Sequence, residues 1–335
     1  MKVVILGAGA SAGYDKSNIH LKAPVARNFF KKAMVLWERD CDRDRFQNLF
    51  KFLERYYSFN LTRLRNENLD IEEVLTILET NKLKIERKEL LEFIYLSLNK
   101  ILFGEYCPYH RDLVESLGRE DAIISFNWDL LVDNALAKKC RQDEMPNYGI
   151  SFTGTYKSDD WHDRLNNRGP RLIKLHGSLN WLECVPCKNN FCYVDRGKVV
   201  AEQITTPDDP RLKCPKCSQN MTPVIIPPTL FKYKAYQRQI FKQLWQQAEN
   251  VLRKAEEVII IGYSLPVTDF KAKWLLMSSV AKRNYPLHCL TVIDKFPENC
   301  LFEKYRNIFG VQQANMRTIT GEIKDYANEL LQATH

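Results

Sequence analysis

Residues 2–13 read KVVILGAGASAG, and this stretch decides the fold. The aliphatic residues 2–6 predict a short buried strand, which glycines alternating with small residues follow directly. A strand, a glycine-rich turn and the start of a helix, in this order, open a βαβ unit with parallel strands. Such a turn lets backbone N–H groups approach a pyrophosphate, and the helix N-terminus favours its negative charge. The opening therefore predicts an α/β fold with a Rossmann-like, doubly wound parallel sheet.

The spacing of this turn differs from the usual dinucleotide-binding pattern. Gly7, Gly9, Ser11 and Gly13 form Gly-x-Gly-x-Ser-x-Gly, where that pattern has Gly-x-Gly-x-x-Gly. No clear acidic residue stands at a second strand tip about 20 residues further on. Both differences disfavour an ordinary dehydrogenase.

The rest of the chain alternates between helical and strand patterns. Helical periodicity with few glycines runs from about residue 25 to residue 117 and predicts an insertion of several helices. Between residues 181 and 228, cysteines and prolines interrupt any periodic element. Further buried strands are predicted at 122–126, 171–175, 257–261 and 289–293, with helices at 240–254, 270–282 and 321–332.

Two Cys-x-x-Cys pairs lie in the irregular stretch. Cys184, Cys187, Cys214 and Cys217 would supply four thiolates for a tetrahedral zinc. Four sulfurs leave no open coordination position, so the predicted role is structural. The two pairs are further apart than the usual spacing of about 15–20 residues. Cys192 offers a fifth thiol that could replace one ligand, and reduced cysteines without metal are the alternative.

These patterns divide the chain into a discontinuous Rossmann-like domain with two inserted parts. The Rossmann-like segments are expected at 1–24, 118–180 and 229–335, the helical insertion at 25–117 and the zinc-ribbon module at 181–228.

Composition indicates an ordinary globular protein. The chain has 335 residues, of which 45% are apolar and 27% charged, unlike a disordered chain. The formal charge of +8 comes from scattered Lys and Arg, which favours a basic enzyme and leaves direct nucleic-acid binding open. No stretch approaches the roughly 20 apolar residues that span a bilayer. The first aliphatic run is also too short for a signal peptide, so we expect a cytoplasmic protein without a membrane partner.

Polar side chains follow two of the predicted strands. Asn127 and Asp129 come after the strand at 122–126, and His176 follows the strand at 171–175. The carboxyl ends of parallel strands share one edge of a sheet, where open α/β sheets bind ligands. Strand-end capping and turn formation are the alternative for each residue taken alone. Together with the glycine turn, the three residues favour a binding site.

In this order, the motifs resemble the sirtuin family. Residues 7–11 match its Gly-Ala-Gly-x-Ser turn, residues 127–129 stand where sirtuins carry Asn-Ile-Asp, and residues 176–177 match their His-Gly. Two Cys-x-x-Cys pairs follow. Residues 261–264 resemble the family's Gly-Thr-Ser segment, and residues 292–294 resemble its strand end at the adenosine ribose. The resemblance covers almost the whole chain outside the helical insertion.

The chain departs from the sirtuin deacylases in two places, and the second place is the segment that pairs with the acyl-lysine peptide in those enzymes. The Gly-Ile-Pro-Asp-Phe-Arg stretch of the family is missing after the phosphate turn, where residues 21–30 read LKAPVARNFF. The Phe-Gly-Glu segment is replaced by residues 224–229, which contain Pro227 and Pro228. Proline cannot donate to a peptide ladder. With the Phe-Asn-Trp-Asp and Gly-Tyr-Ser-Leu-Pro-x-x-Asp segments, the chain is similar to the bacterial sirtuin-like NAD hydrolases of antiviral defence systems.

The resemblance implies cleavage of NAD to ADP-ribose and nicotinamide. Asn127 would position the ribose and the attacking water, Asp129 would orient the nicotinamide pocket or stabilise positive charge, and His176 would act as general base. The remaining site residues would bind the cofactor: Gly7, Ala8, Gly9 and Ser11 at the pyrophosphate, Gly262 and Ser264 at a phosphate or ribose, and Asp294 at the adenosine ribose.

Two other functions stay open. One is an NAD-dependent protein deacylase, and the other is a nucleotide-sensing or partner-binding module without turnover. Constant NAD destruction would kill the host cell, so we expect control by assembly, first as a homo-oligomer. The resemblance adds a regulator, such as a helicase-type ATPase, an Argonaute-like protein or a phage component.

Overall fold

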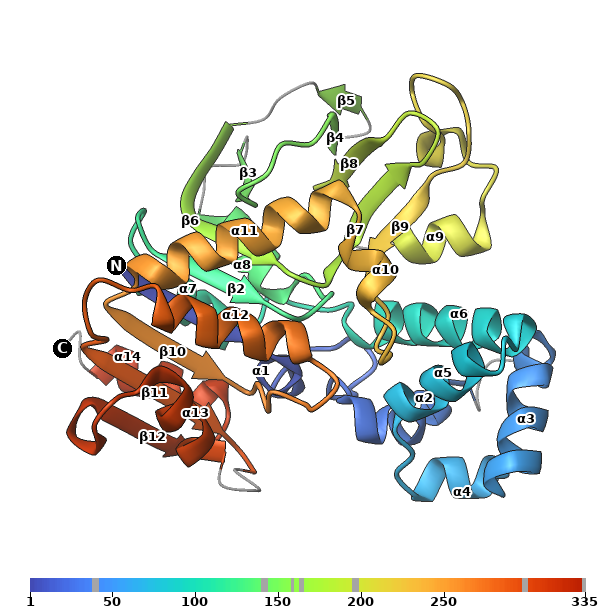
Figure 1. Cartoon of the computed structure of the whole chain (residues 1–335). Coiled ribbons are helices and arrows are strands. Elements are labelled where there is room, and N and C mark those ends of the chain that lie inside the picture. The colour runs from blue at the N-terminus through green and yellow to red at the C-terminus, as the bar shows by residue number, and fades with distance from the viewer. Residues whose placement is uncertain are drawn as a thin grey trace.

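The computed structural model describes residues 1–37, 42–139, 144–157, 160–162, 166–194, 199–296 and 301–332. It contains a large parallel sheet between helical layers, a smaller second sheet and a helical region (Figure 1). Among these residues, no helix is both long and apolar enough to cross a membrane.

The large sheet has seven strands, all paired in parallel. Its central strand is β1, whose residues Val3 to Leu6 are almost completely buried, as a strand covered on both faces must be. Strands from the middle of the chain lie on one side of β1 and strands from its last third lie on the other, which is the doubly wound arrangement predicted from the sequence. In spatial order the strands are β12 (Met316–Thr320), β11 (Cys289–Asp294), β10 (Glu257–Ile261), β1 (Lys2–Leu6), β2 (Ala122–Ser125), β6 (Asn166–Lys174) and β3 (Glu144–Asn147).

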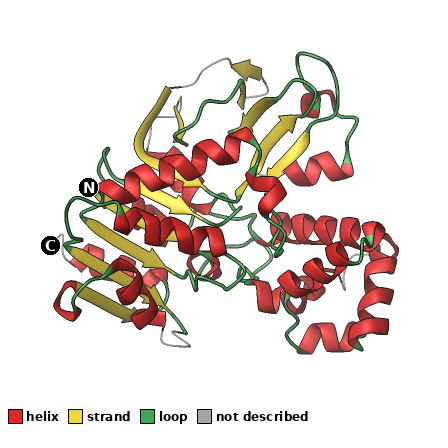
Figure 2. Ribbon diagram, in the orientation of Figure 1, coloured by secondary structure: helices red, strands yellow, loops and turns green. Residues whose placement is uncertain are grey.

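Helices cover both faces of this sheet (Figure 2). The helices α11, α12 and α13 pack against one another on one face, and α7, α8 and α14 form a layer on the other. The strands and helices expected in the last third of the chain are present, whereas the edge strands β3 and β12 had not been predicted. The bounds are α1 (Ala8–Ala12), α7 (Pro108–Glu115), α8 (Leu131–Lys139), α11 (Gln239–Lys254), α12 (Phe270–Ala281), α13 (Leu301–Phe309) and α14 (Ile323–Gln332).

A second sheet corrects the expectation that residues 181–228 lack regular elements. Its pairing depends on contacts across strands that single-sequence periodicity does not reveal, such as Trp181 opposite Cys192. Trp181, Phe191 and Tyr193 of this sheet are fully buried. The strand order is β5 (Asp160–His162), β4 (Gly154–Lys157), β8 (Asn189–Tyr193), β7 (Gly177–Cys184) and β9 (Thr222–Ile225), and α9 (Val199–Thr205) lies beside β7.

The helical region shares its core with the second sheet. Aromatic rings of Phe30, Phe46 and Phe93 pack together there, in the same apolar cluster as Leu182 and Phe191 of the second sheet. The large sheet has a separate apolar cluster. The helices are α2 (Phe29–Trp37), α3 (Gln47–Tyr57), α4 (Leu61–Asn66), α5 (Ile71–Thr80) and α6 (Lys84–Ile101).

Candidate active site

The register of the large sheet brings the predicted residues to one edge. Leu6, the last residue of β1, pairs with both Ser125 of β2 and Ile261 of β10. Because these strand ends are level, the segments that follow them emerge side by side. They border a cavity of about 710 Å³ whose lining reaches residues of the helical region. The predicted residues among its lining are Ala8, Gly9, Ser11, Asn127, Asp129, His176, Gly262, Ser264 and Asp294.

Gly7 is not part of the lining, and close backbone contacts explain why both Gly7 and Gly9 are glycines. The N–H of Gly7 donates to the carbonyl of Ile261 at 3.1 Å, and that of Gly9 donates to the carbonyl of Gly262 at 2.9 Å. A Cβ on Gly9 would lie 2.7 Å from the Cα of Gly262, which has a φ of +59°. The first two glycines therefore shape the floor of the cavity by close backbone packing, and their own N–H groups are engaged there.

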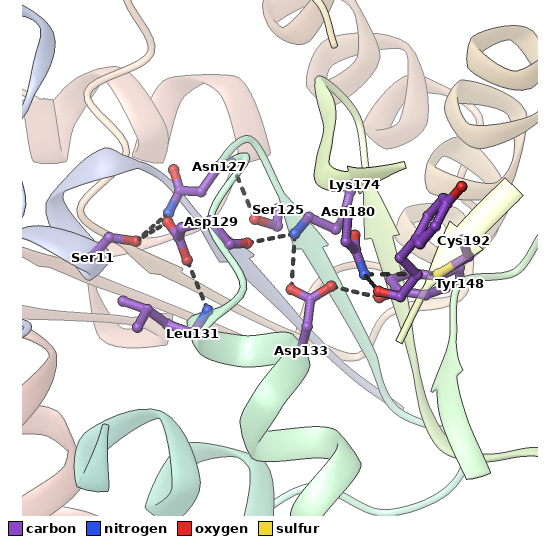
Figure 3. A network of polar contacts seen from close by, with 11 residues as sticks. Ser11, Ser125, Asn127, Asp129, Leu131, Asp133, Tyr148, Lys174, Asn180 and Cys192 are labelled. Carbon is purple, nitrogen blue, oxygen red and sulfur yellow. Dashed lines mark hydrogen bonds and ion pairs between the residues drawn. The ribbon is translucent and has the colours of Figure 1, made fainter. Parts of the chain in front are cut away.

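Three predicted residues form one hydrogen-bonded chain at this floor (Figure 3). Asn127 Nδ2 donates to the carbonyl of Gly7 at 2.8 Å and to Ser11 Oγ at 2.9 Å. Ser11 Oγ donates in turn to Asp129 Oδ2 at 2.6 Å. Asp129 Oδ1 accepts from the N–H of Leu131 at 3.0 Å, so this carboxylate also caps the start of α8. The structural and functional interpretations of Asp129 are therefore compatible.

A buried lysine supports this loop from behind. Lys174 is completely buried, and its Nζ donates to the carbonyl of Asp129 at 2.5 Å and to Asp133 Oδ2 at 2.8 Å. The hydroxyl of Tyr148 donates to Asp133 Oδ1 at 2.7 Å. Burial raises the pKa of Asp133, while Lys174 opposes this shift. Lys174 had not been predicted, although a lysine inside the apolar strand LIKL is an unusual signal.

His176 is one of the residues that line the cavity. Its side chain is buried, and Nε2 has no hydrogen-bond partner among the described residues. The ring packs edge-on against Phe126, with centroids 5.3 Å apart. Burial lowers the pKa of His176 to about 4, and Asp269 opposes this shift. The imidazole is therefore neutral at physiological pH, the protonation state that a general base requires.

Two charged residues near His176 had escaped the sequence analysis. Asp269 Oδ1 lies 3.9 Å from His176 Nε2 and forms an ion pair with Lys232 Nζ. Asp269 Oδ2 accepts from the hydroxyl of Tyr263 at 3.0 Å. Asp269 closes the Gly-Tyr-Ser-Leu-Pro-x-x-Asp segment, which could have identified it, whereas nothing in the sequence singles out Lys232.

The four predicted cysteines form a separate cluster. All four sulfur atoms lie within 4.8 Å of one another, with Cys184 and Cys217 at 3.4 Å and Cys187 and Cys214 at 4.0 Å. Tetrahedral zinc with Zn–S bonds of about 2.3 Å requires sulfur separations of roughly 3.8 Å, so the cluster fits this metal. Cys192 is not part of it, because this residue lies within β8 with its sulfur 3.7 Å from Asn180 Nδ2. None of the four is among the described residues that line the cavity.

Comparisons with known proteins identify similar folds only. No family model matches the chain. No curated protein matches it either. Among solved structures, a sirtuin from work on substrate affinity is 15% identical, with a TM-score of 0.46, covering 100% of this chain and 93% of that one. A Sir2 complex with a p53 peptide and NAD+ has the same identity and coverage and a TM-score of 0.48. A Sir2 enzyme from work on mechanism and regulation is also 15% identical, with a TM-score of 0.47, covering 99% of this chain and 90% of that one. At this level of similarity, the chemistry of the chain must be inferred from its own residues.

Proposed function

We propose that this chain is a sirtuin-like NAD hydrolase that cleaves NAD to ADP-ribose and nicotinamide. One observation carries the proposal: the free Nε2 of His176 and the hydrogen-bonded chain of Asn127, Ser11 and Asp129 border one cavity beside the glycine turn. The cavity volume of about 710 Å³ lies in the range of ordinary small-molecule sites. The group of residues provides an acceptor for a proton, an amide and a carboxylate.

These groups suit the breaking of an N-glycosyl bond. Departure of nicotinamide leaves positive charge on the ribose, and an adjacent carboxylate stabilises such charge. Asp129 would supply it, while Asn127 would position the ribose and the attacking water. His176 would accept a proton from that water or from a ribose hydroxyl. Ala8, Ser264 and Asp294 line the cavity and would hold the remainder of the dinucleotide above the floor that the glycine turn shapes.

The backbone around Pro227 and Pro228 supports hydrolysis over deacylation. The N–H of Ile226 donates to the carbonyl of His176 at 2.9 Å, and that of Leu230 donates to Thr76 Oγ1 of α5 at 3.2 Å. The remaining donors of this segment, on residues 229 and 231, bond within the segment itself. The prolines have no N–H to give. Residues 226–231 therefore offer no free backbone donor for pairing with an acyl-lysine peptide.

Contacts with the helical region hold in place both this segment and the segment that ends at Asp269. The hydroxyl of Thr229 donates to Glu79 Oε2 at 2.6 Å, and that of Thr268 donates to Glu72 Oε2 at 2.8 Å. Both acceptors belong to α5.

A protein deacylase and a module without turnover remain the alternatives. The unpartnered nitrogen of His176 favours a catalyst over a module without turnover.

We further propose that Cys184, Cys187, Cys214 and Cys217 hold one structural zinc. The proposed biological setting is anti-phage defence in a bacterial cytoplasm, with activity controlled by homo-oligomerisation and by a helicase-type ATPase, an Argonaute-like protein or a phage component. Direct nucleic-acid binding stays open in this proposal.

The test is product analysis by chromatography after incubation of the purified chain with NAD, with and without an acetyl-lysine peptide. A hydrolase releases nicotinamide and ADP-ribose in equal amounts whether or not peptide is added. Nicotinamide release that depends on the peptide would instead establish a deacylase.

A further inference from the structure

A buried ion pair lies beside His176 in the lining of the cavity, and the reaction described above makes no use of it. Asp269 and Lys232 are 4% and 3% exposed and both line the cavity. Charged residues are seldom so buried, because removing them from water costs several kcal/mol per ion unless their mutual attraction compensates. Asp269 precedes α12, and Lys232 precedes α10 (Tyr233–Tyr236). Each therefore reaches the cavity from the end of a different helix.

His176 and Lys232 share one carboxylate oxygen. Asp269 Oδ1 pairs with Lys232 Nζ and lies 3.9 Å from His176 Nε2. A backbone group of Phe126 hydrogen-bonds the imidazole, and the hydroxyl of Tyr263 holds Asp269 Oδ2. The ring and the carboxylate are thus held in place, and both residues line the cavity.

We propose that Asp269 and Lys232 are positioning residues that set the basicity of His176. Asp269 stabilises the imidazolium that forms when His176 accepts a proton. Lys232 attracts the same carboxylate oxygen and so keeps the resting imidazole neutral. This inference rests on the proposed function, because it assigns His176 the role of base.

The proton balance of hydrolysis shows where the pair acts. A proton passes from the attacking water to Nε2, the water oxygen bonds to C1′ of the ribose, and nicotinamide leaves with the electrons of the broken C1′–N bond. The new positive charge on His176 then lies about 4 Å from a buried carboxylate, where attraction is much stronger than in water. Release of this proton to solvent restores the neutral base.

Asp269 and Lys232 have opposite effects on the pKa of His176. Burial is the main influence on the pKa of His176 and lowers it, Asp269 raises it, and Lys232 lowers it. Behind the pair stand Glu72 of α5, Tyr236 of α10 and Tyr263, which follows β10. Burial raises the pKa of all three groups, and Lys232 opposes the shift of Glu72. Among the described residues, these are the titratable groups that act on His176 directly or through the pair.

The experiment compares Lys232→Met and Asp269→Asn with the parent chain in kcat/KM for NAD against pH. Activity requires neutral His176, so it falls as the pH drops through the pKa of this group. Lys232→Met leaves Asp269 unopposed and should move the acidic limb to higher pH. Asp269→Asn should move the limb to lower pH and reduce kcat about tenfold, the equivalent of one pKa unit. Lys232→Arg should restore the parent profile.

A second readout separates this inference from the proposed function. NMR titration of the histidine ring protons, with His176 identified by comparison with His176→Gln, reports its pKa without any turnover of NAD. The double variant Lys232→Met, Asp269→Asn removes both charges together and serves if either single variant fails to fold. It should leave the pKa of His176 between those of the two single variants.

The matched control is Arg45→Met, which removes an ion pair with Glu92 in the helical region. It should leave both profiles unchanged, because neither residue lines the cavity. Opposite shifts in the two single variants support the inference. Shifts in the same direction, or no shift in either variant, overturn it, even if the chain proves to hydrolyse NAD.

Discussion

The cavity at the strand ends and the cysteine cluster in the second sheet differ in how their polar groups are satisfied. At the cavity, a buried imidazole nitrogen has no hydrogen-bond partner in the described part of the chain, and a buried ion pair lies beside it. At the cluster, four sulfur atoms form a closed set that matches tetrahedral zinc. An unsatisfied group costs stability and is available for chemistry, whereas a closed ligand set contributes folding free energy. Changes at the two sites should therefore have separable effects on rate and on stability.

The largest effect on rate is expected from His176→Ala. Loss of a general base typically lowers turnover by about 10²–10⁴-fold. Nε2 has no hydrogen-bond partner among the described residues, so His176→Ala loses only the ring packing against Phe126 and the hydrogen bond with its backbone. We expect NAD turnover to fall by at least about 100-fold while the melting temperature falls only moderately. Steady-state kinetics and thermal unfolding, measured on the same preparation, check this. A large fall in melting temperature would mean that His176 supports the fold.

A loss of stability without a change in rate is expected for Cys214→Ser, which removes one ligand of the proposed zinc. A structural metal stabilises the folded state, so this variant should lose zinc and unfold at a lower temperature. The fraction that remains folded should hydrolyse NAD at the parental rate. Cys289→Ser, outside the cluster, is the control and should retain the metal. Elemental analysis that finds no zinc in the parent chain would contradict the assignment.

A smaller effect, on both stability and NAD binding, is expected from Gly262→Ala, where the turn after β10 packs against the turn after β1. Alanine at Gly262 has an unfavourable φ of +59° and a Cβ only 2.4 Å from the nitrogen of Ala10. Gly310 has a similar φ of +62°, but no atom of the described residues lies within 4 Å of a Cβ there. Gly310→Ala should therefore cost only the backbone strain of about 1 kcal/mol, measured by denaturant unfolding. Gly262→Ala should cost more and also raise the KM for NAD; equal costs would remove the argument from close packing.

The smallest effect is expected from Ser264→Ala. This side chain lines the cavity but is exposed, and its proposed contact is one hydrogen bond to a phosphate or ribose. A hydrogen bond of about 1 kcal/mol corresponds to roughly a fivefold rise in KM with kcat unchanged. A fall in kcat would instead mean that Ser264 takes part in the chemical step.

Sequence patterns predicted the parts of the molecule that depend on local order. The strand at residues 2–6, the glycine turn and the polar tips at Asn127 and His176 follow directly from neighbours in the chain. The cysteine cluster was predicted because its two pairs have a recognisable spacing. The polar tips lie where the register of the large sheet brings strand ends together. The two cysteine pairs lie at the turn between β7 and β8 and at the turn closed by the bridge between Lys213 and Asn220.

The residues that were missed depend on contacts between distant segments. Lys232 meets Asp269 37 positions away, and Lys174 meets the carbonyl of Asp129 45 positions away. The second sheet was missed for the same reason, because its pairing is set by partners such as Trp181 and Cys192 across strands. Periodicity within one segment carries no information about such partners.

The most direct test of the central claim follows nicotinamide and ADP-ribose over time in peptide-free reactions of the parent chain and His176→Ala, both with and without candidate activators. The proposed function predicts that the parent chain forms both products in equal amounts and that the variant, although folded, forms almost none. Equal rates in the two proteins, or nicotinamide release only when an acyl-lysine peptide is supplied, would contradict NAD hydrolysis at this site.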